Sequence, residues 1–141
     1  MKYKLTDEFI EFFGQKLFRI ECVTPFGSIT VGTKGGFVAS VNNLSQEGDA
    51  WVYGDAEVYG NAEVYGNAEV KDKKGYISFK NWWSSGRWFT WTSSNNKWKV
   101  GCFYGTGAEL IAKAYKDSQE SGDEYRRIVE YVESIKDKFN E

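Results

Sequence analysis

The sequence predicts a mainly β fold with C-terminal helices, an α+β protein in which a small antiparallel sheet and two helices flank a short hexapeptide-repeat β-helix. Three observations predict it: a tandem six-residue repeat, a run of short aromatic strands after the repeat, and two amphipathic segments at the end. We expect one compact domain in three consecutive parts. They are an N-terminal β region over 1–37, a repeat β-solenoid over 38–72, and an aromatic β-sheet with a two-helix cap over 73–141.

The repeat covers residues 48–71 as four units, GDAWVY, GDAEVY, GNAEVY and GNAEVK. One valine and one alanine recur at the same positions in every unit, which predicts that they point into a solenoid. The glycine of each unit suits a corner where φ is positive. Val38 and Leu44 continue the spacing upstream and extend the predicted solenoid to about two coils. So short a stack leaves its ends open, so we expect flanking segments to cap it and copies of the chain to pack as a homo-oligomer.

The segment before the repeat allows two interpretations. Residues 16–23 alternate apolar and polar side chains, which predicts a strand. Residues 3–5 and 9–13 pair with this strand in one interpretation. In the other, Thr6 caps a short helix that runs through 9–13. The sequence alone leaves both interpretations open.

Three strands and two helices are predicted after the repeat. Turn-like runs of serine, asparagine and glycine separate the strands, which cover 76–82, 87–93 and 97–104. Thr106 with Glu109 has the spacing of a capping box, which predicts the start of the first helix. Ser121 with Glu124 predicts the start of the second helix in the same way.

The composition excludes several classes of function. The chain has no histidine, which excludes nucleophilic catalysis that depends on histidine and zinc sites that use imidazole. Cys22 and Cys102 form no CxxC motif, and we expect both to be buried thiols in a reducing, cytoplasmic setting. No apolar run is long enough for a membrane span, and the first ten residues lack the apolar stretch of a secretory signal. We therefore predict a cytoplasmic, non-enzymatic protein with no cofactor and no metal site.

Charge is unevenly spread, although the net charge is only −2. Residues 48–70 carry five carboxylates and no cation, whereas 71–101 carry seven cations and one carboxylate. The basic block favours an anionic partner, while the negative net charge argues against long nucleic acid.

Residues 76–104 hold five of the six tryptophans together with basic and small polar side chains. Flat rings stack on nucleobases and cations neutralise phosphate, so this block predicts a site for a small nucleotide-type ligand. Adjacent rings on a strand point to opposite faces, so at least two large rings should lie off the core. The same rings could instead form a subunit interface. The residues predicted to bind the ligand are Trp82, Trp83, Arg87, Trp88, Trp91, Lys97, Trp98 and Lys99.

The sequence motifs of the chain resemble those of two groups of proteins. The repeat resembles the left-handed β-helix of hexapeptide acyltransferases, but those enzymes use a histidine base, so acyl transfer does not carry over. The second group is small bacteriophage and prophage proteins with GNAxVYG repeats. The likeness rests on Gly35-Gly36-Phe37-Val38, the step Asn43 to Gly48, the repeats, and a β-rich tail from Tyr76 to Thr106. Phe37 stands where that group commonly has tryptophan. This resemblance implies a phage gene product that acts inside an infected bacterium.

Three hypotheses about function follow. In the first, the protein is a phage-encoded oligomer that sequesters a nucleotide-type immune signalling molecule, which needs no catalytic base. In the second, it inhibits a host defence protein through the acidic solenoid, and reversal of Glu57, Glu63 and Glu69 would abolish activity. In the third, it is a structural or scaffold protein of the phage. The first agrees best with the aromatic and basic block.

Overall fold

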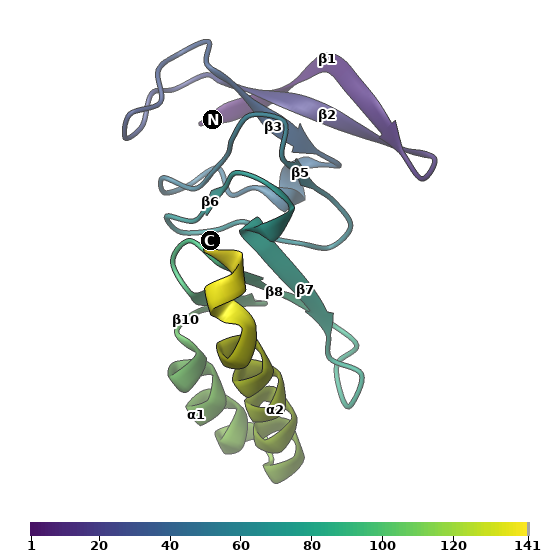
Figure 1. Cartoon of the computed structure of the whole chain (residues 1–141), viewed down its shortest axis with the longest axis vertical. Helices are drawn as coiled ribbons and strands as arrows, with labels where there is room; N and C mark the ends of the chain where they lie inside the picture. The colour runs from purple at the N-terminus through teal and green to yellow at the C-terminus, as the bar shows by residue number, and fades with distance from the viewer. Residues whose placement is uncertain (141) are drawn as a thin grey trace.

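The computed structural model describes residues 1–140 of the chain, and its class is α+β, as predicted. Figure 1 shows an elongated molecule with the N-terminal strands and the repeat at one end and the two helices at the other. Strand β7 runs between these two ends. Within residues 1–140 the repeat forms short paired strands, and no closed β-helix is present.

The N-terminal sheet settles the alternative that the sequence left open. Its strands are β1 (Tyr3–Phe12), β2 (Gln15–Cys22), β3 (Lys34–Val38) and β5 (Glu57–Val58), in the order β1-β2-β3-β5. The predicted strand over 16–23 is therefore confirmed as β2. The alternative prediction, a short helix capped by Thr6, is wrong, because residues 3–12 form strand β1. The Thr6 hydroxyl donates to the carbonyl oxygen of Arg19 at 2.9 Å.

Parallel pairs join the repeat units to one another. Strand β4 (Trp51–Val52) pairs with β6 (Glu69–Val70), so that Val52 lies beside the valine three repeat units later. Leu44 and Val64 form an isolated parallel bridge of the same kind. The repeat valines and alanines are all buried, as their phase predicts: Ala50, Val52, Ala56, Val58, Ala62, Val64, Ala68 and Val70.

The buried Lys2 side chain contacts the start of the repeat. It is only 6 % exposed, and its ammonium donates to three backbone carbonyls, of Glu47 at 3.4 Å, Gly48 at 3.3 Å and Ala50 at 2.7 Å. Burial lowers the pKa of this ammonium to about 8, although nearby Asp49 raises it in part. Lys2, just before β1, therefore ties the N-terminal sheet to the first repeat unit.

This burial predicts that stability rises with pH in a defined interval. The unfolded chain keeps the ordinary Lys2 pKa of 10.5, so between pH 8 and 10.5 it holds a proton that the folded chain has lost. We expect the free energy of unfolding to rise by about 1 kcal/mol between pH 8 and 9.5, and Lys2→Met to remove that rise. Above pH 10 the trend reverses, because burial raises the pKa of Tyr3 to about 12. Urea denaturation of both proteins across this range tests the prediction, and equal slopes would contradict it.

The C-terminal sheet has the order β10-β9-β8-β7, with every neighbouring pair antiparallel. Its strands are β7 (Tyr76–Lys80), β8 (Trp88–Thr92), β9 (Lys97–Val100) and β10 (Phe103–Gly105). The single strand predicted over 97–104 is therefore wrong. It divides into β9 and β10 because Gly101 adopts a φ of +56° and turns the chain.

Two helices follow the sheet, α1 (Gly107–Asp117) and α2 (Gln119–Ile135). The capping box of Thr106 and Glu109 is confirmed at the start of α1. The box predicted at Ser121 and Glu124 is wrong, because α2 begins earlier and the Ser118 side chain accepts from the Ser121 amide. Residues 1–140 also contain three short 3-10 helices, at Val41–Asn43, Lys73–Gly75 and Lys136–Phe139.

The apolar side chains gather in two cores. The first lies between the N-terminal sheet and the repeat, and Trp51 is its largest fully buried side chain. The second lies between the C-terminal sheet and the helices, around Trp91 and Trp98. Cys22 belongs to the first core, but Cys102 is exposed, so the expectation of two buried thiols is wrong for Cys102. No helix within residues 1–140 is both long and apolar enough to span a membrane.

Candidate functional site

The C-terminal sheet has two chemically different faces, set by the alternation of its side chains. The register of β7 and β8 pairs Phe79 with Phe89 and Ile77 with Trp91 on one face. It pairs Ser78 with Thr90 on the other. The apolar face packs on the helices, which leaves the mixed polar and aromatic face directed toward the repeat.

Two of the residues predicted to bind a ligand lie in the apolar face. Trp91 is 0 % exposed and Trp98 is 1 % exposed, and both pack in the core beneath the helices. The indole nitrogen of Trp91 donates to the side-chain oxygen of Asn96 at 2.8 Å. The prediction that these two rings bind a ligand is wrong, because no ring face is open to one.

The opposite face docks on the edge of the repeat through hydrogen bonds. The Glu63 amide donates to the Thr90 hydroxyl at 3.0 Å, and the Glu69 amide donates to the Ser94 hydroxyl at 2.8 Å. The Tyr76 hydroxyl, further along the same face, donates to the carbonyl oxygen of Glu57 at 3.3 Å. These contacts hold the sheet and the repeat together but do not fill the space between them.

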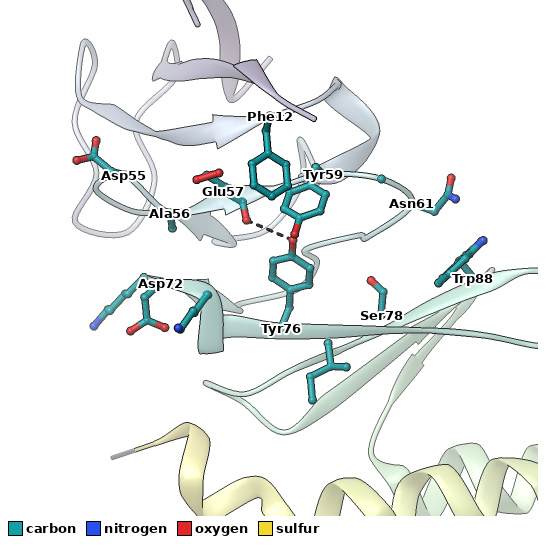
Figure 2. A pocket seen from close by; sticks show the side chains of 14 residues that line it. Phe12, Asp55, Ala56, Glu57, Tyr59, Asn61, Asp72, Tyr76, Ser78 and Trp88 are labelled. Carbon is teal, nitrogen blue, oxygen red and sulfur yellow. Dashed lines mark hydrogen bonds between the residues drawn. The ribbon is translucent and has the colours of Figure 1, made fainter. Parts of the chain in front are cut away.

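A cleft of about 1030 Å³ remains between the repeat, the end of β1 and strand β7. Figure 2 shows the Phe12 and Tyr59 rings on the side of the repeat and Tyr76 rising from β7 to meet them. Asp72 lies to one side of Tyr76, and Ser78 and Trp88 lie to the other. Tyr76 thus stands between a charged part and an aromatic part of the cleft.

The aromatic part offers ring faces to solvent. Trp88 is 41 % exposed and Tyr59 is 38 % exposed, so part of each ring is open to solvent. Phe12 packs against Tyr59 with 4.8 Å between the ring centroids. Burial raises the pKa of the Tyr76 hydroxyl to about 12, so it stays protonated and acts as a hydrogen-bond donor near neutral pH.

The charged part of the cleft combines both signs. Lys71 and Lys73 line it together with Asp55, Glu57 and Asp72. The Asp55 carboxylate pairs with the Arg19 guanidinium at 2.9 Å, and the Asp72 carboxylate accepts from the Lys74 amide at 2.8 Å. The Asp55 and Asp72 carboxylates are therefore engaged locally, and Lys71 pairs with Glu69 at 3.8 Å. Within residues 1–140 the Glu57 carboxylate and the Lys73 ammonium each have no oppositely charged group within 4.0 Å. In the described part of the chain, Lys73 is thus the cation at this end of the cleft that is free to pair with an anionic group.

The other predicted residues lie outside this cleft. Trp82 is 69 % exposed, and the Trp83 indole nitrogen donates to the Ser121 hydroxyl at 3.1 Å. Arg87 lines a separate cavity near α1 and α2. Lys97 lies over the Tyr104 ring at 5.8 Å, and Lys99 lies over the Tyr65 ring at 4.8 Å. Of the eight residues predicted, the structure places only Trp88 in the cleft.

Exposure of Trp82 and Trp88 confirms the prediction that at least two large rings lie off the core. Sequence reasoning missed Phe12, Tyr59, Tyr76 and Ser78 as lining residues. One signal could have found Tyr59. The last position of the repeat unit is tyrosine in three of the four units, and a ring there is not needed inside the solenoid, because the valine and alanine of each unit already point inward.

No protein-family model matches this chain, and no curated protein matches it. Within residues 1–140 no group of three or more cysteine, aspartate or glutamate side chains is arranged to hold a metal ion.

Proposed function

We propose that this protein is a non-enzymatic binding protein that holds a small nucleotide-type ligand in the cleft. The observation that carries the proposal is the exposed Trp88 ring in a cleft that Lys73 also lines. Pockets for small ligands measure about 300–1,000 Å³, and this cleft, at about 1030 Å³, is slightly larger than that range. A base stacked on Trp88 would extend its phosphate groups along the cleft toward the lysines.

The residues of the cleft favour binding over catalysis. The Tyr76 hydroxyl keeps its proton near neutral pH, and Asp55 is held in its ion pair with Arg19. Neither is poised as a general base, and the Asp72 carboxylate accepts from the Lys74 amide, which leaves Glu57 as the one cleft carboxylate in the described chain without a local partner. We therefore propose that the ligand is bound and released intact. In the phage setting implied by the resemblance, the protein would act as a sponge that withholds a nucleotide signal from a bacterial immune system.

We also infer that the repeat units wind as a short solenoid with three units in each coil. The parallel pairing of Val52 with Val70, three repeat units later, supports this interpretation. The homo-oligomer predicted for so short a stack stays a prediction, and the molar mass in solution, measured by light scattering, tests it.

The proposal predicts a difference between two exposed tryptophans. Trp88→Ala should weaken ligand binding by about 5-fold to 150-fold, because stacking on an aromatic side chain contributes about 1–3 kcal/mol per base. Trp82→Ala is the matched control, since Trp82 is more exposed but does not line the cleft. It should leave the dissociation constant within about 2-fold of wild type.

The measurement is calorimetric titration with a panel of cyclic dinucleotides, cyclic trinucleotides and cyclic ADP-ribose isomers. Ligand recovered after denaturation is then analysed for chemical change. The proposal is supported if Trp88→Ala weakens binding, Trp82→Ala does not, and the ligand is recovered intact. Failure of every nucleotide to bind, or equal loss in both variants, overturns it, and altered ligand overturns the non-enzymatic part.

A further inference from the structure

The wall of the cleft contains a polar atom with no partner. Among residues 1–140, the Ser78 hydroxyl oxygen is the one buried side-chain nitrogen or oxygen that makes no hydrogen bond. Its neighbours on the same face are satisfied. The Thr90 hydroxyl, directly across in the register, accepts from the Glu63 amide, and the Tyr76 hydroxyl donates to Glu57. Among the buried polar side-chain atoms that the structure describes on this face, the Ser78 hydroxyl oxygen alone is left without a partner.

A buried hydroxyl without a partner destabilises the folded chain, because it loses its hydrogen bonds to water and gains none in return. Alanine would occupy the same position in β7 without that cost. Native structures hold few such groups, and one that lines a ligand cleft has a direct explanation if the ligand supplies the missing partner.

The position of Ser78 relative to Trp88 fits this explanation. Ser78 pairs with Thr90, and Trp88 lies two residues before Thr90 on the same face of β8. Diagonal neighbours of this kind are about 7–8 Å apart, so the edge of a ring stacked on Trp88 would point toward Ser78. Figure 2 shows the Ser78 side chain extending from β7 into the cleft, on the same side of Tyr76 as Trp88.

We propose that Ser78 hydrogen-bonds to the edge of the ligand's ring and so selects a nucleobase over a plain aromatic ring or a base-free sugar phosphate. This inference rests on the proposed function and assigns the chemistry of one side of the site. A hydroxyl both donates and accepts, so it can meet either a ring nitrogen or an exocyclic group of the base. Trp88 would then supply stacking, and Ser78 would supply recognition of the edge.

The test is Ser78→Ala, measured in two ways with opposite expected signs. Without ligand, we expect the variant to melt about 3 °C higher than wild type, because an unpartnered buried hydroxyl has been removed. With the nucleotides of the panel described above, we expect its affinity to fall about 5-fold to 10-fold, the effect of one lost hydrogen bond. Ribose 5-phosphate, the base-free control, should bind both proteins equally.

The outcomes separate this inference from the proposed function. If Trp88→Ala weakens nucleotide binding and Ser78→Ala does not, the role of Ser78 is overturned and the binding function stands. If Ser78→Ala melts below wild type, its hydroxyl has a structural role and the inference is again overturned. If wild type binds no nucleotide in the panel, both proposals fail together.

Discussion

Trp98→Ala should lower the free energy of unfolding by about 3–5 kcal/mol, the cost of truncating a large buried aromatic side chain. Trp98 is 1 % exposed and lies among three other rings, with centroid distances of 5.9 Å to Phe79, 6.0 Å to Phe89 and 6.5 Å to Trp91. Few side chains can move to fill the space, because the helices already cover this face. A domain of this size is stable by about 5–15 kcal/mol, so the loss is a large share of the total.

The matched control for this prediction is Trp82→Ala. Trp82 is 69 % exposed, so its removal should change stability by no more than about 0.5 kcal/mol. Urea denaturation followed by far-ultraviolet circular dichroism measures both variants. Similar losses in the two would show that the aromatic sheet is not packed as described.

The second large effect is expected at Gly66, where the repeat offers an internal comparison. Gly60 and Gly66 begin units that both read GNAEV, and their φ angles are +63° and +64°. A Cβ added at Gly66 would lie 2.2 Å from the hydroxyl oxygen of Tyr104 and 2.5 Å from the ring carbon that carries it. A Cβ added at Gly60 would meet nothing within 4 Å.

Both substitutions by alanine carry the strain of a left-handed backbone, about 1–2 kcal/mol. Gly66→Ala must also displace the Tyr104 ring, whose hydroxyl oxygen accepts from the Asn95 side chain at 2.8 Å. Overpacking of this kind costs about 1–3 kcal/mol more. We therefore expect Gly66→Ala to lose about 2–5 kcal/mol and Gly60→Ala about 1–2 kcal/mol. Thermal and urea unfolding of the two variants measure the difference. Equal losses of unfolding free energy would mean that the Tyr104 ring does not pack against Gly66.

The inward side chains of the repeat could be predicted because the period is strict. Val58 and Val64 hold the same place in consecutive units, and a place that is apolar in every unit is one that the fold buries. The helix start at Thr106 could be predicted because a capping box is a local interaction. Ser121 also has that spacing, but Ser118 caps α2 first, and the sequence offers no means to rank two competing caps.

The candidate site could be predicted only in part, because it depends on how separate elements pack. Alternation places Trp88 and Trp91 on opposite faces of β8, but it does not say which face the helices cover. Once the helices cover Trp91, Trp88 is left on the side of the repeat. Phe12 and Tyr59 join it across the cleft from distant parts of the chain, and no local pattern links those positions.

The two cores use consecutive parts of the chain, and this has a consequence for synthesis. Every member of the first core lies at or before Tyr76, and every member of the second lies at or after Ile77. The boundary falls between two adjacent residues of β7 that point to opposite faces. A chain leaving the ribosome can therefore complete its first core before the second has been made, and domains generally fold in this order. Strand β7 then presents Ile77 and Phe79 as the surface on which the remaining strands and helices assemble.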